Sequence, residues 1–230
     1  MGKPIIFLGP SLSHEKARKI FDADYRPPAR KGDFLRLAAD FDVVEMAVGF
    51  VDGVFLQDYP PTPIEVYHLA RKKGVLLVGA ASLGALRAVE LEKFGMVGIG
   101  KIFQLYKTGK LDADDEVAVT FASEEGDYKL QSEAMIDIRY NLYLAHRKGI
   151  ISEKAKNVLV KLAKEIYFPH RKYMYILEEA RNRYPMFESE INSFDSYIRS
   201  NRKSLKEMDA IRLVKYLKER YEFTNTISTR

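Results

Sequence analysis

The sequence predicts an α/β protein with a mostly parallel sheet, flanking helices and a helical region after the sheet. Four consecutive large aliphatic residues, Val75–Val78, are typical of a strand buried in the middle of a parallel sheet. This run leads directly into a helical segment that Gly95 ends. Upstream of it, short apolar runs alternate with helical patterns, and after residue 132 the pattern is helical throughout. Such alternation indicates βαβ crossovers.

Local signals define each element. Caps and breakers bound the helices: Ser13, Ser82, Ser152 and Ser204 stand at N-cap positions, and Pro63 opens a helix that Gly74 stops. The expected elements are strands over 4–9, 22–25, 43–50 and 75–78, helices over 14–21, 33–39, 63–73 and 82–95, and a hairpin over 116–131. Residues 95–100 are expected to form a loop or a close-packed segment. We therefore expect a Rossmann-like or flavodoxin-like core over residues 1–131 and a helical C-terminal region over 132–230.

Composition excludes several classes of protein. The 230 residues are 47% hydrophobic and 30% charged, which is typical of a folded globular chain. No apolar run is long enough to span a bilayer and no signal-peptide pattern is present, so we expect a cytoplasmic protein without membrane contact. The chain has no cysteine, which excludes disulfides, thiolate metal sites and a catalytic thiol within it.

Charge is distributed unevenly along the chain. Residues 1–145 contain 18 Lys and Arg against 21 Asp and Glu, whereas residues 146–230 contain 19 against 11. A basic C-terminal region is able to bind nucleic acid or an acidic protein. Its basic residues are scattered and no nucleic-acid-binding motif is present, so nucleic-acid binding is not expected.

Polar residues follow the predicted strands, where parallel sheets bind their ligands. Ser82 follows the central strand in a segment that departs by one glycine from a nucleophile elbow, and Asp52 ends the preceding strand. With His14, these residues are the candidate catalytic side chains: Ser82 as nucleophile or oxyanion donor, and Asp52 or His14 as base. The alternatives are structural: Ser82 as a helix cap, Asp52 in a turn, and His14 in the first turn of its helix.

Further residues at the same loops are candidates for substrate binding. A helix start such as the loop after the first strand is able to hold an anion, although it carries neither a Walker A nor a dinucleotide fingerprint. An acidic run before the hairpin is a candidate cation site or a turn, and we expect no metal and no cofactor. The candidate binding residues are Gly9, Ser11, Ser13, Arg26, Lys31, Asp33, Gly79, Gly84, Arg87, Glu90, Asp114, Asp115 and Glu116.

Taken together, these segments resemble one family, the TfuA-like proteins. The order and spacing agree along roughly residues 5–145, while the tail after 150 carries little of the pattern. Many bacterial members have a His-Lys-Glu stretch where this chain has Pro63–Glu65, so no role of that histidine transfers. The matching segments are Gly9-Pro-Ser-Leu12, Asp24–Ala29 with Lys31-Gly-Asp33, Val51-Asp-Gly-Val-Phe55, Gly79–Arg87 with Glu90-Leu91, Gly95–Phe103 and Asp114–Ala118.

The resemblance implies a partner of YcaO enzymes in peptide-backbone thioamide formation. It implies sulfur supply, through release of sulfide from a thiocarboxylated ubiquitin-like carrier, which makes the chain a candidate thiocarboxylate hydrolase. On composition we favour the archaeal branch associated with the thioglycine of methyl-coenzyme M reductase. Arg87, Arg26 and Lys31 are the candidates for binding the end of the carrier. The alternatives are a non-catalytic adaptor that stimulates YcaO and a nucleotide-binding regulator.

Overall fold

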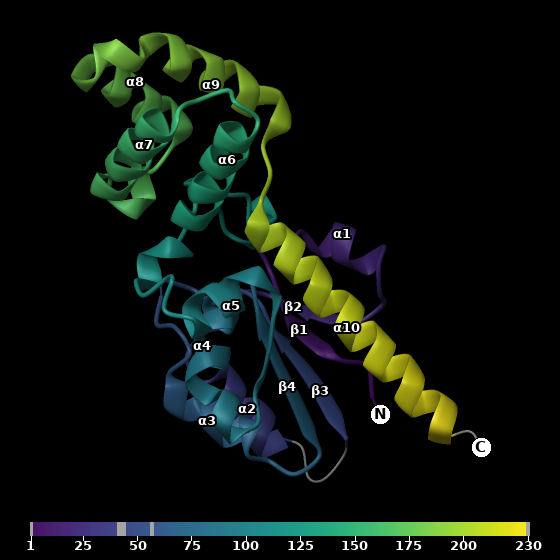
Figure 1. Cartoon of the computed structure of the whole chain (residues 1–230). Helices are drawn as coiled ribbons and strands as arrows, with labels where there is room; N and C mark the ends of the chain where they lie inside the picture. Colours follow the sequence, from purple (N-terminus) through teal and green to yellow (C-terminus); the bar gives the residue numbers. More distant parts are fainter. Residues whose placement is uncertain (1, 41–44, 56–57, 229–230) are drawn as a thin grey trace. The chain divides into compact units, whose positions relative to one another are not determined.

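The computed structural model describes residues 2–40, 45–55 and 58–228, which form two compact units (Figure 1). The first unit comprises residues 1–114, 122–129 and 206–230. The second comprises residues 115–121 and 130–205. The chain therefore leaves the first unit after residue 114 and returns to it twice. Its last helix belongs with the sheet, whereas the sequence analysis grouped residues 132–230 as one region.

The first unit is built on a five-stranded, all-parallel sheet, which confirms the predicted fold class. The order across the sheet is β2-β1-β3-β4-β5, the order of a flavodoxin-like doubly wound fold. Residues 43–44 of the predicted third strand lie outside the described residues. The strands are β1 (Ile5–Phe7), β2 (Asp24–Arg26), β3 (Met46–Phe50), β4 (Val75–Ala80) and β5 (Val97–Ile99).

Of the two predictions for residues 95–100, close packing is observed at Gly98, whereas residues 97–99 form a strand and not a loop. Val97–Ile99 pair in parallel with Val78–Ala80 and form the edge strand β5. Position 98 of this strand is a glycine because the ring of Phe103 occupies the space of a side chain: a Cβ there would lie 2.1 Å from the ring. A strand of three residues that contains a glycine is too short to show the alternation of apolar and polar residues that marks a strand in a sequence. Its pairing with β4 is what identifies it as a strand.

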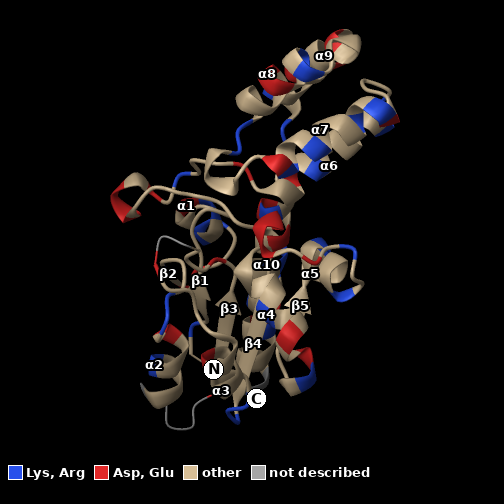
Figure 2. Ribbon diagram, turned by 90° about the vertical axis from the view of Figure 1, so that its left-hand side faces the viewer, with Lys and Arg blue, Asp and Glu red and all other residues tan. Residues whose placement is uncertain are grey.

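The interior of the sheet is apolar on both faces. β1, β3 and β4 carry no charged residue, as Figure 2 shows. On one face, Ile6 of β1 and Val78 of β4 pack in a cluster with Leu213 and Leu217 of the last helix, α10 (Leu205–Ser228), drawn in yellow in Figure 1. This packing explains why α10 belongs to the first unit.

The opposite face is covered by the helices that follow β2, β3 and β4. Phe34 lies between Phe7 of β1 and Phe50 of β3, with ring centroids 5.2 and 4.8 Å away. Aromatic pairs at such distances stabilise a core beyond the area they bury. The remaining helices of this unit are α1 (His14–Arg18), α2 (Asp33–Asp40), α3 (Pro63–Ala70), α4 (Leu83–Leu91) and α5 (Gly100–Lys107).

Capping confirms several of the predicted helix starts. The Ser13 side chain accepts a hydrogen bond from the Lys16 amide, and Thr62 forms a capping box with Glu65 ahead of Pro63. At the far end of the α4 segment, Gly95 adopts a left-handed conformation with φ of 103°, which a residue with a side chain rarely adopts.

A buried carboxylate of α10 meets the start of α5. Asp209 is fully buried and accepts a hydrogen bond of 2.7 Å from the Ile102 amide. Arg212 donates to the other oxygen at 2.9 Å. Burial raises the pKa of Asp209, although these hydrogen bonds and the charge of Arg212 oppose the shift. The Asp209 carboxylate, from a helix far away in the sequence, thus accepts hydrogen bonds from first-turn amides of α5 that have no partner within that helix.

The second unit is a set of packed helices with its own core. Leu142, Leu159, Leu177 and Phe194, one from each helix, belong to one buried cluster. Ser152 caps the second of these helices by accepting from the Ala155 amide, as predicted. The helices are α6 (Met135–Arg147), α7 (Glu153–Glu165), α8 (Tyr173–Arg183) and α9 (Glu188–Asn201).

The predicted hairpin is only partly formed. Phe121 and Leu130 make one isolated antiparallel bridge, and the Ala122 amide donates to the Lys129 carbonyl at 2.9 Å. The residues between are a short 3-10 turn over 124–126 rather than extended strand. The turn chemistry at Glu125–Asp127 was recognised, but the flanking segments pair too briefly to form strands.

Candidate functional site

The carboxyl ends of β1 and β3 lie at the point where the strand order of the sheet reverses direction. From β1 the chain proceeds outward to β2, and it then returns to β3 on the other side of β1. The loops after β1 and β3 therefore diverge, and ligands of doubly wound sheets bind in the opening between such loops. Gly9–Ser13 follow β1 and Asp52 follows β3, so the fold brings these predicted residues to one place.

Asp52 joins the two loops. Its side chain is buried, with 1% of the residue exposed, and one carboxylate oxygen accepts from the amides of Gly9 and Ser11, both at 3.0 Å. The other oxygen accepts from the Ser11 hydroxyl at 2.6 Å. Two backbone amides that an external anion would need are therefore already bound to Asp52. This geometry favours a positioning role for Asp52 over its predicted role as a base.

The loop after β2 is fastened to the same cluster. The Ala29 amide donates to the Asp52 carbonyl at 2.8 Å, and the Val54 amide donates to the Ala29 carbonyl at 3.0 Å. Gly9 packs against Pro28, whose ring would lie 2.6 Å from a Cβ at that position. The loops after β1, β2 and β3 thus form one connected layer over the edge of the sheet.

Ser82 lies on a strained turn at the end of β4. Ala81 has φ of 65°, and the Ser82 amide donates to the Ala80 carbonyl at 2.7 Å, which closes a γ-turn of the rarer, left-handed kind. The Ser82 residue is 7% exposed and its side chain makes no capping hydrogen bond to α4. A non-glycine residue in this conformation costs about 1–3 kcal/mol and is concentrated at functional sites.

Glycines allow α4 to approach β3 and so fix the position of Ser82. A Cβ on Gly84 would lie 1.7 Å from the Phe50 carbonyl oxygen, and one on Gly79 would lie 2.1 Å from the Gly84 carbonyl oxygen. The Gly84 amide donates to the Val51 carbonyl at 3.3 Å. Because β3 and β4 are neighbours, Asp52 and Ser82 leave adjacent strands at the same edge.

His14 is held by other partners. Its Nε2 lies 2.7 Å from the Leu8 carbonyl oxygen, so this nitrogen carries a hydrogen and donates. The ring lies between those of Tyr25 and Tyr128, with centroids at 5.9 and 5.7 Å. Within the described ranges, no hydrogen bond joins His14 to Ser82 or Asp52. The three predicted catalytic side chains share an edge but do not form a hydrogen-bonded triad.

Sequence reasoning missed Tyr128. Tyr128 comes from the segment 122–129, where the chain returns to the first unit. Its ring packs on that of His14 and on Gly9, and a Cβ added to Gly9 would lie 3.2 Å from the ring of Tyr128. Burial raises the pKa of the Tyr128 hydroxyl. Ala81, Asp127 and Tyr128 are the non-glycine residues with positive φ in the described part of the chain. A turn signal at Gly126–Asp127 was visible in the sequence, but nothing there indicates where the turn packs.

The predicted binding residues after β2 are at the surface. Arg26 pairs with Asp24 at 3.0 Å, and both side chains are substantially exposed. The Lys31 ammonium lies 5.6 Å from the centre of the Tyr59 ring. Neither cation is neutralised by a buried acid, so each is available to an anionic group of a ligand.

Asp33, Arg87 and Glu90 make local contacts. Asp33 accepts from the Arg30 amide at 2.6 Å, as expected for a residue at a helix start. Arg87 donates twice to Glu90, at 2.9 and 3.0 Å, and contacts the Pro61 carbonyl at 3.4 Å. Arg87 and Arg26 are thus both paired with acids, whereas Lys31 has no acidic partner among the described residues.

The acidic run after α5 contributes to the second unit. Asp115 pairs with Lys164 and, at 3.0 Å, with the buried Arg171. Glu116 makes two hydrogen bonds of 2.9 Å with Arg139. Burial alone would raise the pKa of Asp115, but Lys164 and Arg171 hold it below its usual value. Both acids have basic partners within the chain, and their predicted role in substrate binding stays a prediction.

The acidic residues do not assemble into a cation site. Asp114 is assigned to the first unit and Asp115 to the second. Among the residues that the structure describes, no group of three His, Asp or Glu side chains is arranged to hold a metal ion. None of the described helices is long and apolar enough to cross a membrane.

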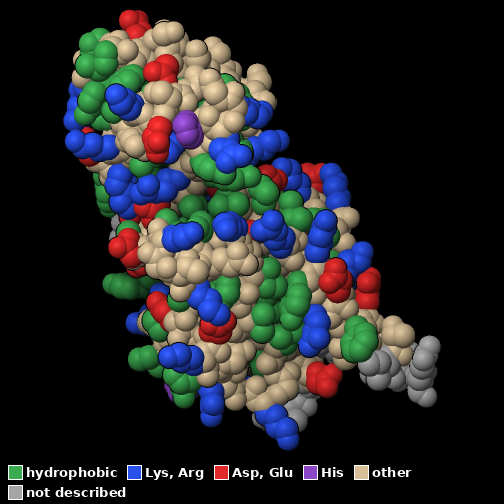
Figure 3. All heavy atoms as spheres, viewed as in Figure 1, with side chains coloured by type: hydrophobic (Ala, Val, Ile, Leu, Met, Phe, Trp, Pro, Cys, Tyr) green, Lys and Arg blue, Asp and Glu red, His purple; other side chains and the backbone are tan. Residues whose placement is uncertain are grey.

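Basic side chains are dispersed on the face of the molecule that Figure 3 shows. On the face that Figure 3 shows, Lys and Arg are spread among apolar and acidic side chains and are not gathered into one dense patch. Nucleic-acid interfaces are typically dense in basic residues. This face therefore offers no such interface.

The fold and the site define a class of protein: a flavodoxin-like α/β unit whose polar loops are hydrogen-bonded to one another at one edge of the sheet beside a strained turn, together with a helical unit. A sequence model of the TfuA-like protein family matches residues 52–172, more than half of the chain, and the chain belongs to that family. The matched range includes Asp52 and Ser82 and excludes the loop after β1. No curated protein matches the chain.

Proposed function

We propose that this protein is an accessory protein of YcaO-dependent peptide-backbone thioamidation that supplies sulfur by hydrolysing a thiocarboxylated ubiquitin-like carrier. Membership of the TfuA-like family supports the accessory role. The observation that carries the hydrolytic step is the γ-turn at Ala81, which holds Ser82 at the sheet edge without a capping bond. Strain of this kind is maintained where a side chain must be held for chemistry.

The proposed reaction needs no thiol of this chain. The Ser82 oxygen attacks the thiocarboxylate carbon and gives up its proton, the carbon–sulfur bond breaks, and sulfide leaves with that proton as HS⁻. Water then hydrolyses the acyl ester, which releases the carrier as a carboxylate and restores the serine. Because the chain has no cysteine, a persulfide on this protein cannot carry the sulfur.

The surrounding residues have distinct proposed roles. We assign stabilisation of the oxyanion of the tetrahedral intermediate to the amide of Leu83, in the first turn of α4. Arg26, the last residue of β2, and Lys31, on the loop that follows it, attract the anionic end of the carrier. Asp52 holds the loop after β1 in its bonded conformation. The protein substrate that we favour, on composition, is methyl-coenzyme M reductase.

A second candidate function is a non-catalytic adaptor that binds and stimulates YcaO. The observation that favours it is the lack of a base: in the described part of the chain neither Asp52 nor His14 hydrogen-bonds to Ser82. Without proton removal, the serine hydroxyl is a weak nucleophile. In this alternative the loops at the sheet edge bind the carrier or YcaO and do not react.

Sulfide release separates the two functions. The assay mixes the protein with thiocarboxylated carrier in the absence of YcaO and measures sulfide, with Ser82→Ala as the test variant. Ser196→Ala, an exposed serine of α9, is the matched control. Release that Ser82→Ala abolishes and the control retains supports the hydrolase. No release, with thioamide formation by YcaO still stimulated, supports the adaptor, and neither activity overturns both.

A further inference from the structure

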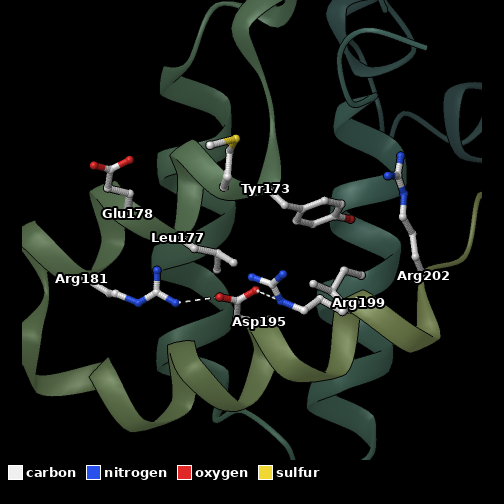
Figure 4. A pocket seen from close by; sticks show the side chains of 9 residues that line it. Tyr173, Leu177, Glu178, Arg181, Asp195, Arg199 and Arg202 are labelled. Carbon is white, nitrogen blue, oxygen red and sulfur yellow. Dashed lines mark hydrogen bonds and ion pairs between the residues drawn. The ribbon is translucent and has the colours of Figure 1, made fainter. Parts of the chain in front are cut away.

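A groove between α8 and α9 in the second unit is assigned no role by the proposed function. It has a volume of about 470 Å³, and Figure 4 shows Arg181, Asp195 and Arg199 converging between the two helices, while Glu178 points away from them. α8 contributes residues one turn apart, and α9 contributes a facing row with the same spacing. The groove, which we term the α8–α9 groove, is lined by Tyr173, Met174, Leu177, Glu178, Arg181, Asp195, Ile198, Arg199 and Arg202.

The floor of the α8–α9 groove is apolar. Leu177 and Ile198 are buried below it, and the ring of Tyr173 closes one end. Met174 stands at the rim with 62% of its surface exposed. An exposed methionine beside a buried aliphatic floor is typical of surfaces that bind apolar side chains of a partner.

Cations outnumber acids along the groove. Arg181 and Arg199 share one carboxylate, that of Asp195, at 2.9 and 3.0 Å (Figure 4). The side chain of Arg199 remains 75% exposed while it makes this contact. Two guanidinium groups on one carboxylate leave donors available, since each guanidinium has five N–H groups. A further carboxylate would complete the pairing.

The Tyr173 end of the groove is held in place by neighbours. Arg202 lies over the Tyr173 ring, 5.7 Å from its centre, and pairs with Glu133. The Asn141 side chain donates to the Tyr173 hydroxyl at 3.1 Å. A preformed surface loses little conformational entropy on binding, which favours its use as an interface.

We propose that the α8–α9 groove binds an amphipathic helix of a partner protein, with apolar side chains on the floor and carboxylates paired to Arg199 and Arg181. From Tyr173 to Arg181 the groove runs for roughly 12 Å, about two turns of a helix. That length suits anchors at positions i, i+4 and i+7 of a bound helix. Arg202 is paired with Glu133, but Arg181 and Arg199 share the single carboxylate of Asp195, so this part of the groove complements a carboxylate on a bound helix.

The same features argue against nucleic acid. Affinity for a phosphate backbone grows with the number of basic contacts, and most of this lining is apolar or acidic. The proposal does not depend on Ser82 or on sulfide release. A result that refutes the hydrolase therefore does not refute helix binding by the groove. A result that refutes helix binding does not refute the hydrolase.

Binding of a defined peptide tests the proposal on the full chain. The probe is a fluorescent peptide of about 14 residues, roughly four helical turns, with leucines at i, i+4 and i+7 and glutamates on both flanks. Two further probes carry lysines in place of the glutamates or the same residues in scrambled order. Fluorescence anisotropy at low and moderate salt is expected to show saturable binding of the acidic amphipathic peptide alone, weakened by salt.

Variants locate the binding. Met174→Glu with Arg199→Glu changes two exposed rim residues and is expected to weaken binding at least about tenfold, or about 1.4 kcal/mol. Met186→Glu with Arg147→Glu makes the same chemical changes at exposed residues outside the groove and is expected to bind normally. Circular dichroism checks that both remain folded, with Arg199→Gln as a milder alternative.

Three outcomes overturn the proposal: no saturable binding, equal binding of the scrambled or basic peptide, or equal weakening by the two double variants. Competition of an RNA oligomer with the peptide for the α8–α9 groove also overturns the proposal.

Discussion

Asp52→Asn separates a positioning carboxylate from a catalytic base. The carboxylate accepts hydrogen bonds from two buried amides and one hydroxyl. An asparagine oxygen still accepts from the amides of Gly9 and Ser11. Its NH2 group faces the Ser11 hydroxyl, which is able to turn and accept. Asparagine thus retains the pattern of contacts and removes the charge.

The expected loss of stability follows from the change in bond type. Hydrogen bonds to a charged group contribute about 1.5–3 kcal/mol and neutral ones about 0.5–1.5 kcal/mol, so two amide bonds lose roughly 2 kcal/mol together. Asp52→Ala leaves all three buried donors unpaired, at about 1–3 kcal/mol each, and is expected to cost roughly 5 kcal/mol. Because the chain has no tryptophan, circular dichroism is the suitable probe of urea unfolding.

Sulfide release from the thiocarboxylated carrier completes the test. With Asp52 as a positioning residue, Asp52→Asn is expected to retain release within about tenfold, whereas loss of a general base costs about 10²–10⁴-fold. A variant as stable as the natural chain that has lost release by a hundredfold or more refutes the positioning role. Equal instability of the Asn and Ala variants refutes the hydrogen-bond reasoning.

Three further predictions concern the scaffold of the site. Gly84→Ala places a Cβ 1.7 Å from the Phe50 carbonyl oxygen and is expected to cost more than about 3 kcal/mol, and an unchanged thermal midpoint contradicts this. A fragment of residues 1–131 lacks α10, which covers one face of the sheet, and is expected not to unfold cooperatively; a cooperative transition supports the predicted domain boundary instead. Burial raises the pKa of Asp209 above its unfolded value, so its contribution to stability is expected to rise as pH falls from neutral through its folded pKa. Unfolding free energies measured against pH are expected to show a weaker rise in Asp209→Asn, and an identical profile argues against it.

Local sequence signals predicted most of the first unit correctly. Caps and breakers such as Ser13, Pro63 and Gly95 act within a few residues of themselves, so their effects are readable along the chain. The central strand β4 begins with a run of four aliphatic residues, which is typical of a strand inside a parallel sheet. β5 escaped prediction because its pairing with β4 defines it.

The sequence predicted that the loops after β1, β3 and β4 meet at one edge of the sheet, but it did not predict the contacts that they make there. Ser82 stands at a cap position, yet its side chain makes no capping hydrogen bond, and its amide closes the γ-turn at Ala81. Asp52 has the sequence context of a turn or a base, and its partners Gly9 and Ser11 lie about forty positions away. Contacts over such separations have no local signature in a single sequence.

The sequence by itself determined the class of fold, the edge of the sheet that carries polar loops and the exclusion of cysteine chemistry, because these depend on local pattern and composition. Tertiary structure alone decided that α10 covers the sheet, that Tyr128 packs on the loop after β1 and that Asp52 holds that loop. An amphipathic helix or a turn specifies that one face will be buried. Which surface buries it depends on packing of the whole chain.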